Sequence, residues 1–415
     1  MDSLPAELKL QIVSYLDGDA PSVQNFTGEP SVENWAHCKH QPLKSLSLVS
    51  RKWRIAVFPS LFRNIRLNLD SMGPPLLISD DPLYSLRLEG FSAFPPTPVL
   101  QNRITSLFVY ATATNEWVTQ IDSLVDFWGA ILPLMPHLQR IVILANPEAI
   151  GNLIDIHIVL HDSWAFDMPL QAIMLEQAPG SEYDTFMDLP DDRRFPRTMC
   201  RNGVLDPRKW TNISINEGSS LKAYSTYEYF HKTPPSISRG LKEYFRVTPL
   251  FQTLTHITFV AIFPLPDAVE RFVARFAKLR LVVQSLTVQL APLYASRLLE
   301  DPERVGTAQL SDCWSELGES YRSLGEEIPQ QAARKGSRLR LFRCLDWGLY
   351  EGFQEELSLS LGGPLAIYGW ETAGDGIWRR PVEADSETGS ASDGTDAGFD
   401  ISDWEDEAMD AFGDH

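Results

Sequence analysis

The hydrophobic positions at the start of the chain have the period of an α-helix. Apolar side chains recur every four residues, at Leu4, Leu8, Ile12 and Leu16. This spacing lines up apolar side chains along one stripe of a helix, with polar residues on the other faces. Pro5 suits the first helical position because the N–H that proline lacks has no partner there. The pattern predicts an amphipathic helix over residues 4–16, which Asp17 and Gly18 would end.

A second helical pattern follows Pro42. Its apolar residues are spaced three or four apart, at Leu43, Leu46, Val49, Trp53 and Val57. Pro59 then interrupts the pattern, and a short apolar segment runs from Leu61 to Ile65. Residues 1–66 are therefore predicted to form a small unit of three helices.

Residues 17–41, between the first two helices, show little periodicity. They are rich in Gly, Pro, Asn, Ser and Asp, and their large apolar residues are Phe26 and Trp35. Such composition is typical of a loop, so this segment is predicted to be a polar insertion.

From residue 67 to residue 372 the pattern changes to short alternating runs separated by helical stretches. The strand-like runs are NIRLNL, LYSLRL, ITSLFVY, LQRIVIL, IDIHIVL (residues 154–160), LQAIML, LTHITFV and QSLTVQL. Helices are expected at 117–134, 267–279 and 309–328. Strands that alternate with helices predict an αβ domain, and the chain as a whole falls in the α+β or αβ class.

Two architectures fit this αβ region. Apolar-x-x-apolar-x-apolar runs begin at Phe62, Leu83 and Ile104, each 21 residues apart, and the run from Leu138 places Asn146 where a leucine-rich repeat has its ladder asparagine. In a chain that is 44% hydrophobic such runs also arise by chance, and the later intervals are longer. A curved solenoid resembling leucine-rich repeats and a mixed-sheet αβ domain both remain open.

Charge is distributed unevenly. The chain has a net charge of −19, and residues 383–415 hold twelve acidic residues with no Lys or Arg. Residues 373–415 are predicted to be a disordered acidic tail, because so polar a segment buries too little apolar surface to fold alone. An acidic protein repels phosphate groups, so nucleic acid is not expected as a partner. No apolar run is long enough to cross a membrane, and the amino-terminal residues lack the pattern of a secretory signal, so we expect a location in the cytoplasm, the nucleus or both.

Few patterns suggest chemistry. The sequence contains none of the common hydrolase, phosphate-binding, zinc-protease or dinucleotide-binding motifs, so no catalytic residue and no cofactor are expected. HCKH at residues 37–40 offers metal ligands without a recognisable fourth, and no metal is expected. The basic stretch from Arg334 to Arg343 is interpreted as a solvated hairpin face or an intramolecular partner for the acidic tail.

The first 66 residues resemble an F-box of the fungal form. The similarity lies in LPAEL at residues 4–8, in Ile12 and Leu16, in LKSLSLVSRKWR at residues 43–54, and in PSLF at residues 59–62. The resemblance implies a helical domain that docks on the Skp-type adaptor of an SCF (cullin-RING) ubiquitin ligase, while the rest of the chain presents a protein substrate. The protein would then be a non-catalytic substrate-recognition subunit. A scaffold that binds the adaptor without delivering substrates is the alternative.

A small three-helix unit is at the lower limit of independent stability, which favours a partner that completes its apolar surface. The residues expected to contact the adaptor are Leu4, Pro5, Leu8, Ile12, Leu16, Leu43, Leu46, Val49, Trp53 and Leu61. We expect Trp53 to be the main anchor, because aromatic residues dominate interface energetics. The substrate would bind the concave face of the strands, and the insertion at 17–41 departs from the short connection usual in the family.

Overall fold

The computed structural model describes residues 4–36, 42–71, 101–112, 127–128, 131–166, 168–177, 204–205, 209–241, 253–279 and 282–381. The helices are α1 (Ala6–Leu16), α2 (Pro21–Gln24), α3 (Val32–Ala36), α4 (Pro42–Ser47), α5 (Arg51–Leu61), α8 (Pro147–Leu153), α9 (Ile237–Gly240), α11 (Pro266–Leu279), α12 (Pro302–Val305), α13 (Leu310–Ala333), α14 (Phe353–Leu357) and α15 (Gly363–Ile367). The strands are β1 (Asn64–Asn68), β2 (Ser106–Ala111), β3 (Arg140–Ala145), β4 (Gln171–Glu176), β5 (Asn212–Ser219), β6 (His256–Ile262), β7 (Ser285–Gln289), β8 (Leu341–Cys344), β9 (Glu371–Gly374) and β10 (Ile377–Arg379).

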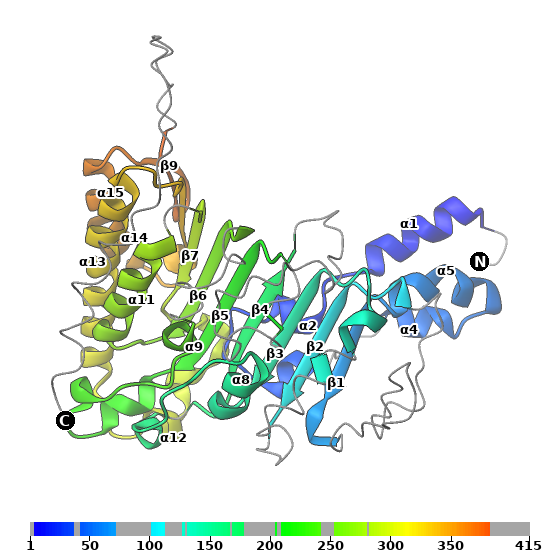
Figure 1. Cartoon of the computed structure of the whole chain (residues 1–415), viewed down its shortest axis with the longest axis horizontal. Helices are drawn as coiled ribbons and strands as arrows, with labels where there is room; N and C mark the ends of the chain where they lie inside the picture. Colours follow the sequence, from blue (N-terminus) through cyan, green and yellow to red (C-terminus); the bar gives the residue numbers. More distant parts are fainter. Residues whose placement is uncertain are drawn as a thin grey trace, which may run out of the picture. The chain divides into compact units, whose positions relative to one another are not determined.

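Among the described residues one ten-stranded sheet follows the amino-terminal helices (Figure 1). Its strands lie side by side in chain order, except that β10 lies between β8 and β9. Strands β1 to β3 are parallel, and so are β5 to β8, whereas β4 runs antiparallel to both of its neighbours. The sheet is mixed and open, as the second of the two predicted architectures has it. The leucine-rich solenoid is not confirmed, since β4 breaks the uniform strand direction of such a repeat.

Alternate residues of the strands enter two separate cores. In β2, Leu107 and Val109 pack in the large core that the sheet shares with α8, α11 and α13, whereas Phe108 and Tyr110 belong to a smaller core on the opposite face. Figure 1 shows α8, α9, α11 and α13 lying along the sheet. This division follows from the two-residue side-chain period of a strand, and it leaves a second sheet face that the predicted helices do not cover.

Several predicted elements agree with the structure. The runs NIRLNL, ITSLFVY, LQRIVIL, LQAIML, LTHITFV and QSLTVQL lie in β1, β2, β3, β4, β6 and β7, and the helices expected at 267–279 and 309–328 are α11 and α13. The run LYSLRL and most of the helix expected at 117–134 lie outside the described residues.

Two interpretations of single segments were wrong. Residues 154–160 form no strand; they follow α8 as irregular chain, and Ile154, Ile156 and Ile158 enter the large core from there. Asn146 is not a ladder asparagine, because its side chain accepts a hydrogen bond from the N–H of Ala149 at 2.8 Å and so caps α8. The alternating apolar residues of 154–160 resemble a strand, and the helix-capping residue Asn146 resembles the asparagine of a leucine-rich repeat, although neither has that role here.

The folded region extends farther than predicted. The tail was expected to begin at residue 373, but β9 and β10 form a hairpin whose second strand pairs with β8, and Trp378 is buried against Phe342. The predicted boundary is therefore too early. Residues 382–415 lie outside the described residues. No helix in the part of the chain that the structure describes is long and apolar enough to cross a membrane.

Candidate functional site

The three helices α1, α4 and α5 enclose a core of their own. Val13, Trp53 and Val57 are buried at its centre, and Leu4, Leu43, Leu46 and Leu61 pack around them. Ser50 caps α5 by accepting a hydrogen bond from the N–H of Trp53 at 3.3 Å. Trp53 is only 1% exposed, so a docked partner cannot contact it. The prediction that Trp53 is the main docking anchor is wrong. Its side chain packs in the core of the helical unit, beneath the exposed residues.

Other apolar residues of the same unit remain exposed. On α1, Leu8 is 45% exposed and Ile12 36%, and Val49, which follows α4, is 57% exposed. Pro5 is exposed as well. Sequence reasoning missed Ile55 on α5, which is 68% exposed. Leu10, Tyr15 and Leu48 add to the exposed apolar surface of this unit.

Helix geometry explains why some of the predicted docking residues are buried and others are exposed. A step of four residues advances about 40° beyond a full turn, so the row from Leu4 to Leu16 winds around α1 instead of staying on one side. Val13 and Lys9 turn toward the other helices and are buried, while Leu8 and Ile12 turn away. The same reasoning applied to α5 could have identified Ile55, because it lies between the inward-facing Trp53 and Val57.

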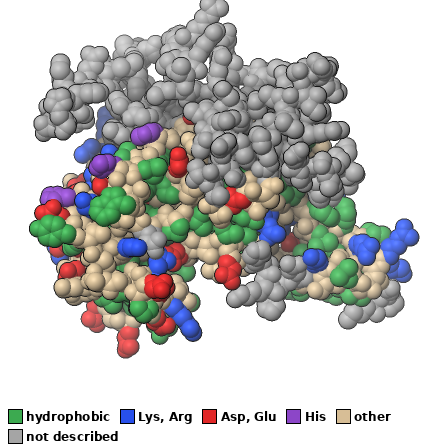
Figure 2. All heavy atoms as spheres, turned by 90° about the horizontal axis from the view of Figure 1, so that it is seen from below, with side chains coloured by type: hydrophobic (Ala, Val, Ile, Leu, Met, Phe, Trp, Pro, Cys, Tyr) green, Lys and Arg blue, Asp and Glu red, His purple; other side chains and the backbone are tan. Residues whose placement is uncertain are grey.

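The exposed apolar residues of α4 and α5 lie among positive charges. Lys44, Arg51, Lys52 and Arg54 are all exposed, and residues 42–61 contain no acidic side chain. Figure 2 shows hydrophobic and basic side chains next to one another at the end of the molecule where this helical unit lies. Such a surface favours a partner that offers apolar side chains together with carboxylates.

The insertion between α1 and α4 is folded onto the sheet. Phe26, Trp35 and Ala36 are buried against the second sheet face, where they contact a core formed by Phe108, Tyr110, Val142, Leu144, Ala172 and Met174 of β2, β3 and β4. The ring centroids of Phe26 and Trp35 are 5.4 Å apart. The prediction that residues 17–41 are merely a polar loop is therefore wrong for its described part, because two aromatic anchors outweigh the polar composition.

Side chains of the sheet hold the backbone of this insertion. Asn216 of β5 donates from Nδ2 to the carbonyl oxygens of Phe26 and Gly28, at 2.6 and 2.7 Å. Gln289 of β7 donates to the carbonyl oxygen of Thr27 at 2.7 Å, and Arg304 pairs with Glu29. These polar side chains supply the hydrogen bonds that an irregular segment needs when it is buried.

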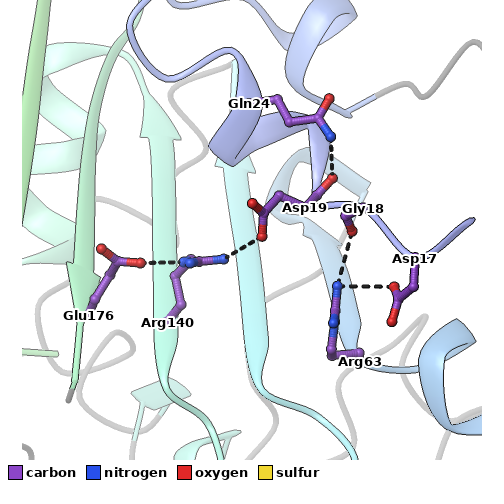
Figure 3. A network of polar contacts seen from close by, with 7 residues as sticks. All are labelled: Asp17, Gly18, Asp19, Gln24, Arg63, Arg140 and Glu176. Atoms are coloured by element: carbon purple, nitrogen blue, oxygen red, sulfur yellow. Dashed lines mark hydrogen bonds and ion pairs between the residues drawn. The ribbon is translucent and has the colours of Figure 1, made fainter. Parts of the chain in front are cut away.

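Charged contacts fix the point where the insertion leaves α1 (Figure 3). Arg63 pairs with Asp17 at 3.0 Å and donates to the carbonyl oxygen of Gly18. Arg140 of β3 lies between Glu176, at 2.6 Å, and Asp19, at 3.7 Å. The insertion thus joins the helical unit to the sheet through apolar, hydrogen-bonded and charged contacts.

A pocket of about 670 Å³ lies where the helical unit meets the sheet. Leu16, Leu43 and Leu61 line this pocket together with Trp35 of the insertion and Phe108 of β2. Further residues of the insertion and of β1 complete the lining. Three of the predicted docking residues therefore face the junction with the sheet. With Leu4, Leu46 and Trp53 in the helical core, four predicted residues remain on the outer surface: Pro5, Leu8, Ile12 and Val49.

The concave strand face was expected to bind the substrate. Its apolar part on β2, β3 and β4 is already covered by the insertion. Toward β5 to β8 the same face becomes polar: the register aligns Ser214, Thr258, Thr287 and Arg343 in one row across the four strands. The expectation is therefore wrong for the apolar half of this face.

In the described part of the chain, the polar side chains of the segment IHIVLHDSW form no hydrogen bond or ion pair with one another. His157 and His161 are exposed, and Asp162 accepts a hydrogen bond from the N–H of Thr233 at 2.9 Å. No group of His, Cys, Asp and Glu in the described ranges could hold a metal, and HCKH lies outside them.

Asp346 is a buried carboxyl group with a strongly raised pKa. Asp346 accepts hydrogen bonds from the hydroxyl of Tyr321 and from the N–H of Leu290, at 2.5 and 2.7 Å. Burial raises the pKa of Asp346 to about 7 and raises the pKa of Tyr321 well above its ordinary value. Asp346 is fully buried, and its hydrogen bonds link α13 to the residues that directly follow β7 and β8.

Comparison with known proteins agrees with this location of the site. The model of the F-box-like family matches residues 1–68, which extend from the residues before α1 to the end of β1. No curated protein and no solved structure matches the chain. The match covers the helical unit with its exposed apolar residues and includes the insertion.

Proposed function

We propose that this F-box domain-containing protein, whose F-box-like domain spans residues 1–68, docks on a Skp-type adaptor of an SCF ubiquitin ligase. F-box domains in general bind adaptors of this type. The observation that carries the proposal is that the helical unit has a complete core of its own and still exposes Leu8, Ile12, Val49 and Ile55. Exposed apolar residues concentrated on one small unit are typical of a surface that a partner covers.

In this proposal the exposed residues contact the adaptor and the buried ones hold them in place. Trp53 and Val57 fix the angle between α1 and α5, so they act on binding only through the fold of the unit. Leu16, Leu43 and Leu61 line the pocket at the junction with the sheet and are not assigned to the adaptor contact.

The remainder of the chain would serve as a non-catalytic substrate receptor. The folded insertion supports this role, because it fastens the helical unit to the sheet by contacts with Asn216, Gln289 and Arg140. A receptor that is rigidly joined to its docking domain holds a substrate in one position relative to the ligase. Cullin binding through the adaptor, action in the cytoplasm or nucleus, and the fungal form of the F-box belong to the same proposal and rest on the sequence.

A scaffold that binds the adaptor without delivering substrates is the second candidate. One observation favours it: the apolar half of the strand face expected to bind a substrate is occupied by the chain's own insertion. The two candidates share the docking surface and differ only in what the sheet binds.

Co-expression of the full chain with a Skp-type adaptor tests the docking proposal. We expect the two to co-purify, and the double variant Leu8→Ala/Ile12→Ala to lose most of the adaptor while its unfolding temperature stays close to that of the wild type. The matched control is Leu359→Ala/Ile367→Ala, since these residues are 80% and 83% exposed and lie far along the chain. A wild-type chain that fails to retain the adaptor contradicts the proposal.

Protein half-lives separate the two candidates. In cells that lack this protein, a substrate receptor predicts at least one protein with a longer half-life, restored by the wild-type chain but not by Leu8→Ala/Ile12→Ala. Unchanged half-lives across the proteome support the scaffold.

A further inference from the structure

The last helical stretch that packs on α13 contains a wide turn. Residues 353–367 form one continuous helix, made of α14, a π-helical turn at Ser358–Gly362 and α15. Every fourth side chain of this helix is buried in the large core: Phe353, Leu357, Leu361 and Leu365. A row with this spacing winds about 40° per step around a regular α-helix, and the wider π turn offsets part of that drift. The four side chains therefore stay on the side of the helix that faces α13.

Contacts with α13 hold this helix in place. The ring centroids of Phe353 and Tyr321 are 5.7 Å apart. A Cβ atom at Gly325 would overlap the carbonyl oxygen of Ser360, so the two helices meet backbone to backbone at that glycine. Figure 1 shows α14 and α15 next to α13, at the far end of the sheet from the amino-terminal helices. The outward side of this helix is therefore a fixed surface.

That outward side exposes large aliphatic side chains. Leu359 and Ile367 each lie two residues from a buried leucine, which places them opposite the core. They are more exposed than every other Leu, Ile or Val side chain that the structure describes, including those of the amino-terminal helices. The two lie about 12 Å apart along the helix axis, and the exposed Tyr368 follows Ile367. Large apolar side chains held together on one fixed surface are typical of a site that a partner covers.

The surroundings of these side chains are acidic. Between Leu345 and Trp378 the sequence contains no Lys or Arg. No ion pair within the described ranges involves the exposed carboxylates of this stretch, which are Glu351, Glu355, Glu356, Glu371 and Asp375. Glu355 lies four residues before Leu359, in the same row, and the side chain of Glu356 lies next to Gly318 of α13. We use the name acidic helix face for Glu355, Glu356, Leu359, Ile367 and Tyr368.

Charge distinguishes between the occupants that this face could have. A second copy of the face would bring carboxylates against carboxylates, and the phosphate groups of nucleic acid or of an anionic membrane would be repelled as well. A segment that carries Lys or Arg next to apolar side chains is attracted. In a helical segment, apolar side chains seven residues apart lie on one side at about 10 Å, close to the separation of Leu359 and Ile367. The face therefore fits a cationic amphipathic helix.

We propose that the acidic helix face binds a cationic amphipathic segment of a partner protein. Lysines or arginines of the segment meet the two glutamates, and two of its apolar side chains cover Leu359 and Ile367. The identity of the partner rests on the proposed function, because in a substrate receptor this segment belongs to the substrate. Binding of the segment itself requires no adaptor and is measured separately from adaptor docking.

Fluorescence anisotropy of the full chain with a labelled synthetic peptide tests the proposal. The probe is a peptide of about 16 residues built from Ala, Lys and Leu, long enough to form a helix on binding, with two leucines seven residues apart and its lysines beside one of them. We expect the wild type to bind this peptide with an affinity that falls severalfold between 0.1 M and 1 M salt, where the screening length drops from about 10 Å to about 3 Å. A peptide with glutamate in place of each lysine should not bind.

Removing the apolar side chains tests the face itself. Leu359→Ala/Ile367→Ala should raise the dissociation constant of the cationic peptide at least about tenfold. The matched control is Trp164→Ala/Tyr227→Ala, at exposed apolar side chains outside the face, which should bind the peptide like the wild type. Adaptor binding by Leu359→Ala/Ile367→Ala should be unchanged, so failure of this proposal and failure of adaptor docking are separate results.

Removing the carboxylates provides the second comparison. Glu355→Gln/Glu356→Gln should weaken peptide binding severalfold, whereas Glu148→Gln/Glu228→Gln, at exposed carboxylates outside the face, should not. If the variants fail to fold, the comparison of the two peptides on the wild type decides. The proposal is overturned if the wild type does not bind the cationic peptide, if the glutamate peptide binds equally well, or if the folded variants bind with wild-type affinity. It is also overturned if sedimentation shows that the face joins two copies of the chain.

Discussion

Asn216 donates a hydrogen bond from Nδ2 to the carbonyl oxygen of Phe26 at 2.6 Å and so joins β5 to an insertion 190 residues earlier in the chain. Both residues are buried, and Phe26 also packs into the apolar core on that sheet face. This contact connects the helical unit, for which we propose adaptor docking, to the sheet, because the insertion begins at the end of α1 and lies on one face of the sheet.

Replacing Asn216 should loosen the insertion. Asn216→Ala leaves the buried carbonyl oxygen of Phe26 and the partly buried one of Gly28 without this donor, a loss of about 1–3 kcal/mol. We expect a lower free energy of unfolding and faster hydrogen exchange in residues 20–36. The control is Asn212→Ala, four residues earlier on the same strand, which should leave the exchange of the insertion unchanged. Equal exchange in both variants would show that the amide does not hold the insertion.

Trp53→Ala should act on folding. The side chain is 1% exposed at the centre of the helical core, so its truncation creates a cavity at a cost of about 3–5 kcal/mol. We expect a large loss of stability with protease-sensitive sites in α1 and α5. Trp164→Ala is the control, since Trp164 is 65% exposed and its loss should change the unfolding temperature little. A stable Trp53→Ala variant that only loses adaptor binding would restore Trp53 as a docking residue.

Asp346 should make stability depend on pH. Its pKa in the folded protein is about 7, above the ordinary value of 3.8. At pH values between these two, the folded state therefore keeps a proton that the unfolded state releases. The stabilising contribution is complete below pH 4 and is lost as the pH rises to 7. Asp346→Asn should flatten the fall in unfolding free energy measured by denaturant between pH 4 and pH 7, whereas Asp375→Asn, at an exposed turn, should not. Parallel curves for wild type and Asp346→Asn contradict this assignment.

Adaptor binding should depend on salt. Residues 42–61 carry four exposed cations and no carboxylate, so we expect a lower association rate at higher ionic strength. Arg51→Glu/Lys52→Glu should slow association, with a smaller change in dissociation, as measured by stopped-flow mixing. A matched reversal at Lys222 and Arg297 should have no effect. Association rates that do not respond to salt would show that these charges lie outside the interface.

Local patterns predicted α1 and most central strands, because period and capping act over a few residues. The helix expected from Leu43 to Val57 is instead split into α4 and α5, and Pro59 lies inside α5. The third apolar segment, from Leu61 to Ile65, is not a helix, because it ends α5 and begins β1.

Local patterns failed where contacts with residues far away in the sequence determine the local structure. The polar composition of residues 17–41 concealed the two aromatic anchors, Phe26 and Trp35, whose binding surface exists only after β2, β3 and β4 align. The direction of β4 and the inward position of Trp53 likewise depend on packing partners elsewhere in the chain.

The affinity of the purified full chain for a Skp-type adaptor tests the central claim most directly. Calorimetric titration should give a dissociation constant that rises at least about tenfold in Leu8→Ala/Val49→Ala, as expected when more than 1.4 kcal/mol of interface energy is lost. The control Leu359→Ala/Ile367→Ala should bind like the wild type. A folded Leu8→Ala/Val49→Ala variant with wild-type affinity would contradict the account.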